Sequence, residues 1–233
     1  MSSSSVRWSP LESNPETMTS YINTLGVENG WMFSDVYGVD PELLCLIPRP
    51  CCAFILLFPI TDTYKSYCGE ENDSIEKNGQ TLSSNLFYMK QTIGNACGTI
   101  GVIHALGNSR DKIALKDNSV FKNFFDKVQG QNPEDIGKIL ESDTSFTKAH
   151  TDAAQSGETP AMSADTPVDL HFVALVHKDG SLYELDGRKN FPINHGPTSE
   201  EDFVSDAAAV CKKFMARDPN ELRFTILALS KQD

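Results

Sequence analysis

Apolar and polar positions along the chain form patterns that predict a mixture of helices and strands. Residues 53–58 are continuously apolar and lie between prolines, which is typical of a central strand buried on both faces. Asn14 followed by Pro15 predicts a helix start, and Gly26 is placed to end that helix. Shorter runs predict strands at 31–36 and 224–229. Helices are predicted at residues 40–42, 61–67, 97–106, 120–128, 133–140 and 200–215.

Two strand-like runs, residues 170–176 and 182–186, flank a segment that contains Asp179 and Gly180. Asp-Gly between such runs is a strong signal for a β-hairpin with a two-residue turn. With that turn, Asp186 pairs with Val173, and His171 lies on the same face one diagonal step away, roughly 7–8 Å between Cα atoms. An imidazole and a carboxylate can form a hydrogen bond across that separation. A turn one residue longer or shorter would place them on opposite faces.

Residues 148–167 differ from the rest of the chain. They are rich in Ala, Ser, Thr, Gly, Pro and Asp and have no sustained periodicity, which predicts a long mobile loop. A loop of this kind inside a compact domain is uncommon and is usually functional or a linker. The chain contains no internal repeat, and its mixed helices and strands indicate one α/β domain over residues 1–233 with a mixed sheet.

The composition excludes global disorder and narrows the candidate partners. Of the 233 residues 39% are hydrophobic, enough for a sizeable core. The net charge of −12 repels phosphate and anionic lipid, so nucleic acids and membranes are poor candidate partners and a basic protein or peptide is a better one. The longest apolar stretch, residues 51–60, is about half of the ~20 residues that a membrane helix needs. Residues 1–10 lack the apolar region of a secretory signal.

The six cysteines predict free thiols. None of them forms a CxxC pair and two are adjacent, which disfavours a disulfide framework or a structural zinc site and fits a reducing cytoplasm. The HExxH, P-loop and GxGxxG patterns are absent from the sequence.

Residues 91–99 carry the strongest chemical signal. Small and polar residues lead to Cys97, which begins an apolar helical run, and a helix N-terminus favours the thiolate form of a cysteine. Gln91 is placed to present an amide donor which, with the backbone N–H of Cys97, can form an oxyanion hole. With His171 and Asp186, Cys97 has the arrangement of an activated nucleophile, although a free cysteine can instead be a small buried hydrophobic residue. The other histidines are expected elsewhere, in the core for His104 and on the surface or in loops for His150, His177 and His195.

Several short blocks along the chain are together highly specific. The most informative are NACGT at residues 95–99, DLHF at 169–172 and ELDGR at 184–188. They are accompanied by RWSPLE at 7–12, DVYG at 35–38, FPI at 58–60, QTIG at 91–94 and ELRF at 221–224. These blocks resemble the ubiquitin carboxyl-terminal hydrolases, in particular the short L-type isozymes that consist of the catalytic domain alone. The resemblance covers essentially the whole chain.

The resemblance implies an α/β (α+β), papain-like fold, with a central mixed or antiparallel sheet, helices on both of its faces and a knotted backbone. It implies that Cys97 is the nucleophile, His171 the base, Asp186 the orienting carboxylate and Gln91 the oxyanion donor. The family uses no metal or cofactor. It cleaves small adducts or short peptides from the carboxyl-terminal glycine of ubiquitin, and sometimes of Nedd8. A ubiquitin tail carries arginines, which suit an acidic enzyme.

The resemblance also implies three segments that contact ubiquitin. They are an N-terminal segment, a crossover loop over the active site at residues 148–167, and a region near the C-terminus. The residues concerned are Pro10, Leu11, Glu12, Ser13, Asn14, Ala154, Glu158, Glu221, Leu222, Arg223 and Phe224. Nothing in the sequence calls for a dimer, so we expect a monomer.

Two alternatives share these features. The first is a catalytically silent ubiquitin-binding protein on the same fold, which the intact catalytic blocks disfavour. The second is an acyltransferase that uses the same three side chains but transfers the acyl group to an amine rather than to water. A ubiquitin amide substrate separates the three functions. Binding without turnover indicates the silent binding protein, turnover that an added amine accelerates indicates the acyltransferase, and turnover that the amine does not change indicates the hydrolase.

Overall fold

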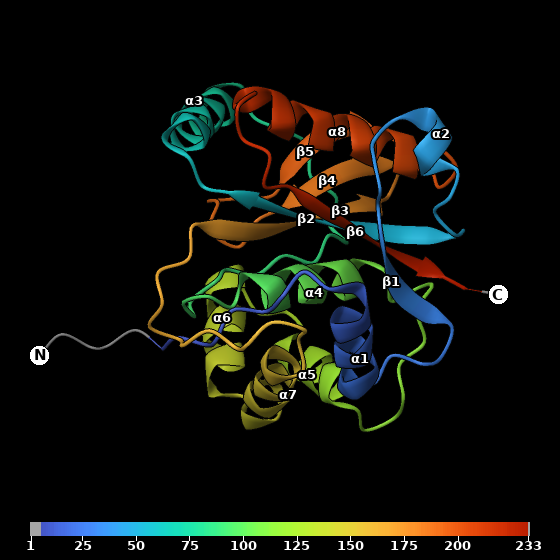
Figure 1. The fold of residues 1–233 in the computed structure, drawn as a ribbon, viewed down its shortest axis with the longest axis vertical. Helices are drawn as coiled ribbons and strands as arrows, with labels where there is room; N and C mark the ends of the chain where they lie inside the picture. Colours follow the sequence, from blue (N-terminus) through green and yellow to red (C-terminus); the bar gives the residue numbers. More distant parts are fainter. Residues whose placement is uncertain (1–5, 233) are drawn as a thin grey trace, which may run out of the picture.

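A six-stranded sheet with strand order β1-β6-β2-β3-β4-β5 forms the centre of the molecule (Figure 1). The computed structural model describes residues 6–232. All neighbouring strands of the sheet are antiparallel. The sheet is therefore antiparallel rather than mixed. The strands are β1 (Trp31–Asp35), β2 (Cys51–Pro59), β3 (Leu170–Lys178), β4 (Ser181–Leu185), β5 (Ile193–Pro197) and β6 (Thr225–Lys231).

Strand β2 occupies the interior of the sheet, between β6 and β3, as its apolar run predicted. Alternate side chains of a strand point to opposite faces, and both faces of β2 are covered. Ala53 and Ile55 belong to one hydrophobic cluster, whereas Phe54 and Leu56 belong to a second one on the other side of the sheet. Burial of both sets explains why the strand reads as continuously apolar rather than alternating.

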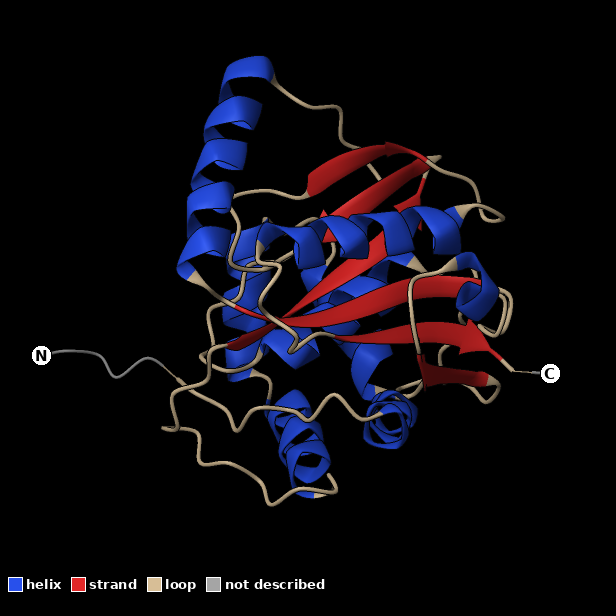
Figure 2. Cartoon of the chain, turned by 45° about the horizontal axis from the view of Figure 1, so that its top comes forward, coloured by secondary structure: helices blue, strands red, loops and turns tan. Residues whose placement is uncertain are grey.

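Helices cover both faces of the sheet, as expected for this fold class (Figures 1 and 2). One layer holds α1 (Pro15–Leu25), α4 (Cys97–Asn108), α5 (Val120–Val128), α6 (Pro133–Ser142) and α7 (Thr144–Gln155). The other holds α2 (Pro41–Leu44), α3 (Asp62–Asn78) and α8 (Phe203–Arg217). Helix α1 begins and ends where the sequence predicted. Asn14 accepts a hydrogen bond from the backbone N–H of Thr17, and Gly26 ends the helix with a φ of 106°.

The prediction of a loop over residues 148–167 is wrong for its first part, because α7 continues to Gln155. Asp143 caps this helix by accepting from the backbone N–H groups of Ser145 and Phe146. Its buried face includes Phe146, Ala149 and Ala153, at helical spacing. Alanine contributes little to a hydrophobic pattern, which is why the sequence signal was weak. The loop between α7 and β3 therefore comprises residues 156–169.

Other boundaries differ for similar reasons. Helix α3 continues to Asn78, well beyond the predicted residue 67, although its C-terminal half has hardly any apolar residues. Strand β5 was not predicted, because its INHGP sequence contains glycine and proline, which strands accept mainly at edges. No helix within residues 6–232 has the length and apolar character needed to cross a bilayer. The expectation about a secretory signal rests partly on residues 1–5, which lie outside the described residues.

Candidate active site

The β3–β4 hairpin brings His171 and Asp186 together. Asp179 and Gly180 both have positive φ values, as a two-residue hairpin turn requires, and Lys178 pairs with Ser181 in the predicted register. His171 is at the start of β3 and Asp186 directly follows β4. Nε2 of His171 lies 2.7 Å from Oδ1 of Asp186, and the two side chains are 1% and 3% exposed. The hairpin thus forms a buried imidazole–carboxylate pair.

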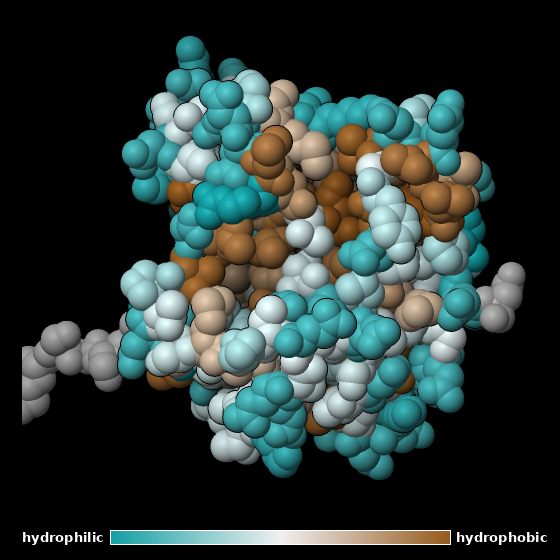
Figure 3. Space-filling model, in the orientation of Figure 1, coloured by the Kyte–Doolittle hydropathy of each residue, from teal (hydrophilic) through white to brown (hydrophobic). Residues whose placement is uncertain are grey.

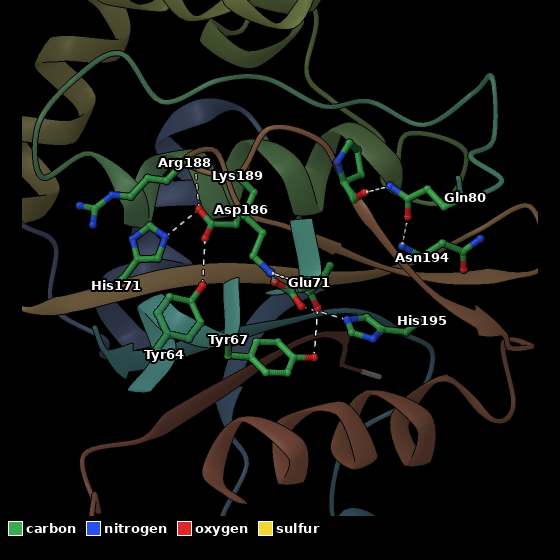
Figure 4. Close-up of polar contacts among 12 residues, drawn as sticks. Tyr64, Tyr67, Glu71, Gln80, His171, Asp186, Arg188, Lys189, Asn194 and His195 are labelled. Atoms are coloured by element: carbon green, nitrogen blue, oxygen red, sulfur yellow. Dashed lines mark hydrogen bonds and ion pairs between the residues drawn. The ribbon is translucent and has the colours of Figure 1, made fainter. Parts of the chain in front are cut away.

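Three donors fix the carboxylate of Asp186 (Figure 4). Besides His171, the backbone N–H of Arg188 donates to Oδ1 at 2.8 Å, and the hydroxyl of Tyr64 donates to Oδ2 at 3.3 Å. Burial alone would raise the pKa of Asp186, but the attraction of His171 and the bond from Arg188 lower it overall. The group is therefore held as a carboxylate.

Cys97 is the first residue of α4 and is 6% exposed. Because Nε2 of His171 is occupied by Asp186, Nδ1 is the ring nitrogen left for the thiol, and it makes no hydrogen bond within residues 6–232. Burial raises the pKa of Cys97, but the neighbouring His171, together with the backbone of Phe172 and the charge of Arg188, lowers that pKa overall. Burial likewise lowers the pKa of His171, whereas Asp186 and Cys97 raise it to about 9. Both shifts favour a thiolate–imidazolium pair.

Gln91 lies beside the segment that carries Asp186. Its backbone N–H donates to the carbonyl of Gly187 at 2.9 Å, and a Cβ built on Gly187 would lie 3.0 Å from Cβ of Gln91. A side chain at position 187 would therefore force these two segments apart by a few tenths of an ångström. Nε2 of Gln91 donates to the carbonyl of Ile93 at 3.0 Å, which uses one of its two N–H groups and leaves the second free to donate.

A small pocket of about 50 Å³ opens onto Cys97. Its lining is mainly apolar and includes Leu11, Phe172 and, from the loop at residues 156–169, Met162 and Val168. On the face drawn in Figure 3, apolar surface gathers between the two layers of helices and hydrophilic residues surround it. A larger cavity of about 760 Å³ lies near α5 and does not include Cys97. The loop therefore borders the space next to Cys97.

Comparison with known proteins shows which family the chain belongs to. The family described as ubiquitin carboxyl-terminal hydrolase, family 1, matches residues 8–216. The chain belongs to this family. A ubiquitin carboxyl-terminal hydrolase of Drosophila melanogaster is 52% identical to it over 223 residues, which cover 96% of this chain and 97% of the relative. The human isozyme L1 is 42% identical over 222 residues, which cover 95% and 97% of the two chains. The protein is thus a ubiquitin carboxyl-terminal hydrolase, a cysteine peptidase.

A solved structure shares the fold of this hydrolase. The catalytic domain of UCH37 from Trichinella spiralis, bound to ubiquitin vinyl methyl ester, has a TM-score of 0.75 to this chain at 22% sequence identity. The similarity covers 97% of this chain and 96% of that domain. At such low identity the likeness concerns the fold, which confirms the expected fold class.

The residues expected to contact ubiquitin fall into three groups in this hydrolase, according to their burial. Leu222 is 86% exposed, and Glu158 and Arg223 are also on the surface. Ala154 and Leu11 are each 6% exposed and belong to the core. Ala154 is in the buried face of α7, which leaves its side chain little surface for a contact with ubiquitin. Leu11 lines the small pocket next to Cys97. The half-buried members are Pro10, Glu12, Ser13, Asn14, Glu221 and Phe224.

The other four histidines of this hydrolase are buried or half-buried. His104 is in the core, as expected. His150 is not on the surface, because its ring is buried between the hydroxyl of Thr99 and the carbonyl of Ser9, at 2.8 and 2.7 Å. His177 and His195 are half-buried on β3 and β5. Alanine-rich α7 hid the helical position of His150 from the sequence.

Two contributors to the site had no signal in the sequence. Tyr64 is 122 positions from Asp186, and a tyrosine in a helix gives no indication of a distant carboxylate partner. Lys189 reads as a surface lysine, yet its ammonium is buried between Glu71 and Glu184, 2.6 Å from each. Among the described residues no group of three or more His, Cys, Asp or Glu side chains is arranged to hold a metal ion.

Proposed function

We propose that this hydrolase cleaves small adducts and short peptides from the carboxyl-terminal glycine of ubiquitin, with Cys97 as the nucleophile. The observation that carries the proposal is the buried His171–Asp186 pair at 2.7 Å, whose remaining ring nitrogen is free for the thiol. Because this pair stabilises imidazolium, it makes the thiolate available near neutral pH. Nedd8 is a second substrate of the same proposal, to be compared with ubiquitin directly.

The proposed reaction has two steps. The thiolate of Cys97 attacks the carbonyl carbon of the terminal glycine, while the backbone N–H of Cys97 and the free N–H of Gln91 stabilise the developing oxyanion. His171 then donates its Nδ1 proton to the leaving group, which leaves a thioester on Cys97. In the second step Nδ1 takes a proton from water, the hydroxide attacks the thioester, and the ubiquitin carboxylate is released. Asp186 holds the imidazole in one tautomer throughout.

The loop at residues 156–169 supports a preference for small leaving groups. Fully extended, its roughly 14 residues span about 50 Å, so a ring closed by this loop is narrower than a folded domain with a diameter of about 30 Å. Arg7 Nε and Asn95 Nδ2 both donate to the carbonyl of Ala164, at 3.0 and 2.9 Å, which ties the loop down near its middle. A flexible peptide can thread this opening, and a folded ubiquitin cannot.

Charge supports the proposed partner. Glu158 is part of the loop, and Glu12 accepts a hydrogen bond from the backbone N–H of Thr159 in the same loop. These carboxylates suit a ubiquitin tail that carries arginines. The UCH37 domain with the same fold is itself bound to a ubiquitin derivative. We propose that the ubiquitin-binding surface comprises Glu12 and Glu158, together with Pro10, Ser13, Asn14, Glu221, Leu222, Arg223 and Phe224.

Ubiquitin that carries a fluorogenic carboxyl-terminal amide tests the proposal. We expect rapid release of the fluorophore by the native enzyme and none by Cys97→Ala, which should still bind ubiquitin. Addition of a primary amine should leave the rate unchanged, because water is the acceptor. Acceleration by the amine would indicate acyl transfer, and binding without turnover would indicate a silent ubiquitin-binding protein. The same assay with Nedd8 measures the preference between the two modifiers.

A further inference from the structure

Helix α3 is attached to the protein in an unusual way. Its sequence is polar on most sides, it projects from the sheet (Figure 2), and Tyr64 is its only buried residue. Apart from Tyr64, whose ring packs on Phe58 and Phe214, the helix offers little apolar surface, so polar contacts contribute much of its attachment. Two of these contacts lead to the segment that carries Asp186.

Two side chains of α3 form polar contacts with the two ends of one turn, residues 186–189. The hydroxyl of Tyr64 donates to Oδ2 of Asp186, and the carboxylate of Glu71 accepts from the ammonium of Lys189 (Figure 4). Positions 64 and 71 are two helical turns apart and therefore lie on the same side of α3. Asp186 and Lys189 are the first and last residues of the turn, since the backbone N–H of Lys189 donates to the carbonyl of Asp186 at 3.0 Å.

The turn at residues 186–189 sets the rotation of the catalytic carboxylate. Within this turn the backbone N–H of Arg188 donates to Oδ1 of Asp186 at 2.8 Å. The hydroxyl of Tyr88 lies 2.7 Å from the carbonyl oxygens of both Asp186 and Lys189 and so contacts both ends of the turn. Lys189 also binds Glu184 on β4, so its ammonium joins the strand before the turn to α3.

We propose that α3 is a positioning element for the catalytic carboxylate, with Tyr64 and Glu71 as its positioning residues. Tyr64 holds Oδ2 while His171 and Arg188 hold Oδ1, so the plane of the carboxylate stays aligned with the imidazole. Glu71 fixes the far end of the turn through Lys189. This inference rests on the proposed role of Asp186 in catalysis.

Ionisable groups lie near Asp186 on several elements. His171 on β3 faces it directly, Glu184 comes from β4, and Tyr64 comes from α3. Tyr88 approaches from the segment before α4, where burial, then the charge of Asp186, raises the pKa of the phenol.

His104 on α4 is also near Asp186, and burial lowers its pKa to about 4. Glu184 pairs in turn with Lys189 and with His195 on β5. Tyr64→Phe, Glu71→Ala and Glu70→Ala all retain the groups outside α3, so a profile that differs between the variants and the control reports on the His171–Cys97 pair.

The test compares Tyr64→Phe and Glu71→Ala with the matched control Glu70→Ala. Glu70 is the neighbouring, exposed glutamate on the same helix, so the control makes the same change without the contact to Lys189. Tyr64→Phe retains the ring that packs on Phe58 and Phe214. Glu71→Ala leaves Lys189 paired with Glu184, and we therefore expect both variants to fold.

Two readouts are needed. The first is kcat and KM for the fluorogenic ubiquitin amide, where we expect kcat to fall about tenfold with KM nearly unchanged, since misalignment of a positioned group acts on the chemical step. The second is the pH dependence of iodoacetamide alkylation, followed by mass spectrometry on the peptide that contains Cys97. A less well aligned Asp186 stabilises imidazolium less, so the alkylation midpoint should move to higher pH by about half a unit.

A role of α3 in folding alone predicts a different result. If both variants melt at lower temperature but keep the kcat and the alkylation midpoint of Glu70→Ala, the positioning role is wrong. The alkylation readout uses no ubiquitin, and so it separates this inference from the proposed function. A native enzyme that leaves the ubiquitin amide intact would overturn the proposed function, whereas shifted midpoints in the two variants would still support positioning by α3.

Discussion

Replacement of Asp186 by asparagine removes one negative charge from the site and keeps the shape of the side chain. The carboxylate is buried, 2.7 Å from Nε2 of His171. An asparagine oxygen still accepts from the backbone N–H of Arg188, so we expect the turn and the fold to persist. The variant loses the charge that stabilises imidazolium.

The structure sets the size of this effect. Burial lowers the pKa of His171, but Asp186 and then Cys97 raise it from 6.5 to about 9. At about 1.4 kcal/mol for each pKa unit, the rise corresponds to about 3 kcal/mol in favour of imidazolium. Asp186 is the largest contributor to the rise, so asparagine should remove most of it. We expect kcat of Asp186→Asn to fall by about 10²- to 10³-fold, with KM nearly unchanged.

The fluorogenic ubiquitin amide gives kcat and KM, and alkylation of Cys97 across neutral pH gives the midpoint of the thiolate. That midpoint should move to higher pH in Asp186→Asn. Asp143→Asn is the matched control, because Asp143 is also a buried carboxylate, paired with Lys127 at 3.0 Å, but lies at the start of α7. Asparagine also caps helices well, so α7 should persist. Loss of the negative charge beside His171 should lower kcat far more than loss of the charge of Asp143. A kcat of Asp186→Asn within about twofold of this control would therefore refute the reasoning.

Four further results are expected. Cys97→Ala should abolish hydrolysis with an almost unchanged melting temperature, and any residual turnover of the ubiquitin amide would contradict a cysteine mechanism. Gln91→Ala should lower kcat by about 10²-fold, as loss of one oxyanion donor does, whereas an effect on KM alone would make it a binding residue. A Gly/Ser insertion of about ten residues between Pro160 and Ala161 should speed cleavage of folded diubiquitin at little cost in stability, since loop-closure entropy grows only logarithmically, and no gain would argue against the steric filter. Burial raises the pKa of Glu184, but Lys189 and His195 lower it overall, so its contribution to stability is present above pH 4.5 and declines as the pH falls below that value. Urea unfolding at a series of acidic pH values should therefore show a shallower loss of stability for Glu184→Gln.

The parts of the site that the sequence predicted share one property, which is that local rules determine them. The apolar run of β2, the Asp-Gly turn of the hairpin and the caps of α1 depend on neighbouring residues, and each is present as predicted. The same hairpin register put His171 and Asp186 on one face. A turn of two residues leaves no freedom in that pairing, so a local signal was enough to place two residues of the site.

The parts that the sequence missed depend on distant partners or on weak hydrophobic signals. Tyr64 reaches Asp186 across 122 positions, and no periodicity encodes such a contact. Helix α7 buries alanines, which add little to a pattern but pack closely against α1. The second half of α3 has almost no apolar side, and its place depends on Glu71 and Lys189 rather than on a hydrophobic face.

The distribution of the site between the two layers explains why such contacts matter. Cys97 belongs to the hydrophobic cluster that α1, α4 and α5 form on one face of the sheet. Tyr64 belongs to the cluster on the other face, where α8 packs. His171 and Asp186 lie between them, at the end of the β3–β4 hairpin. Each layer can pack well by itself without fixing the thiol against the imidazole. The polar contacts of Asp186 with α3 and with the turn therefore determine that alignment, which the hydrophobic cores leave open.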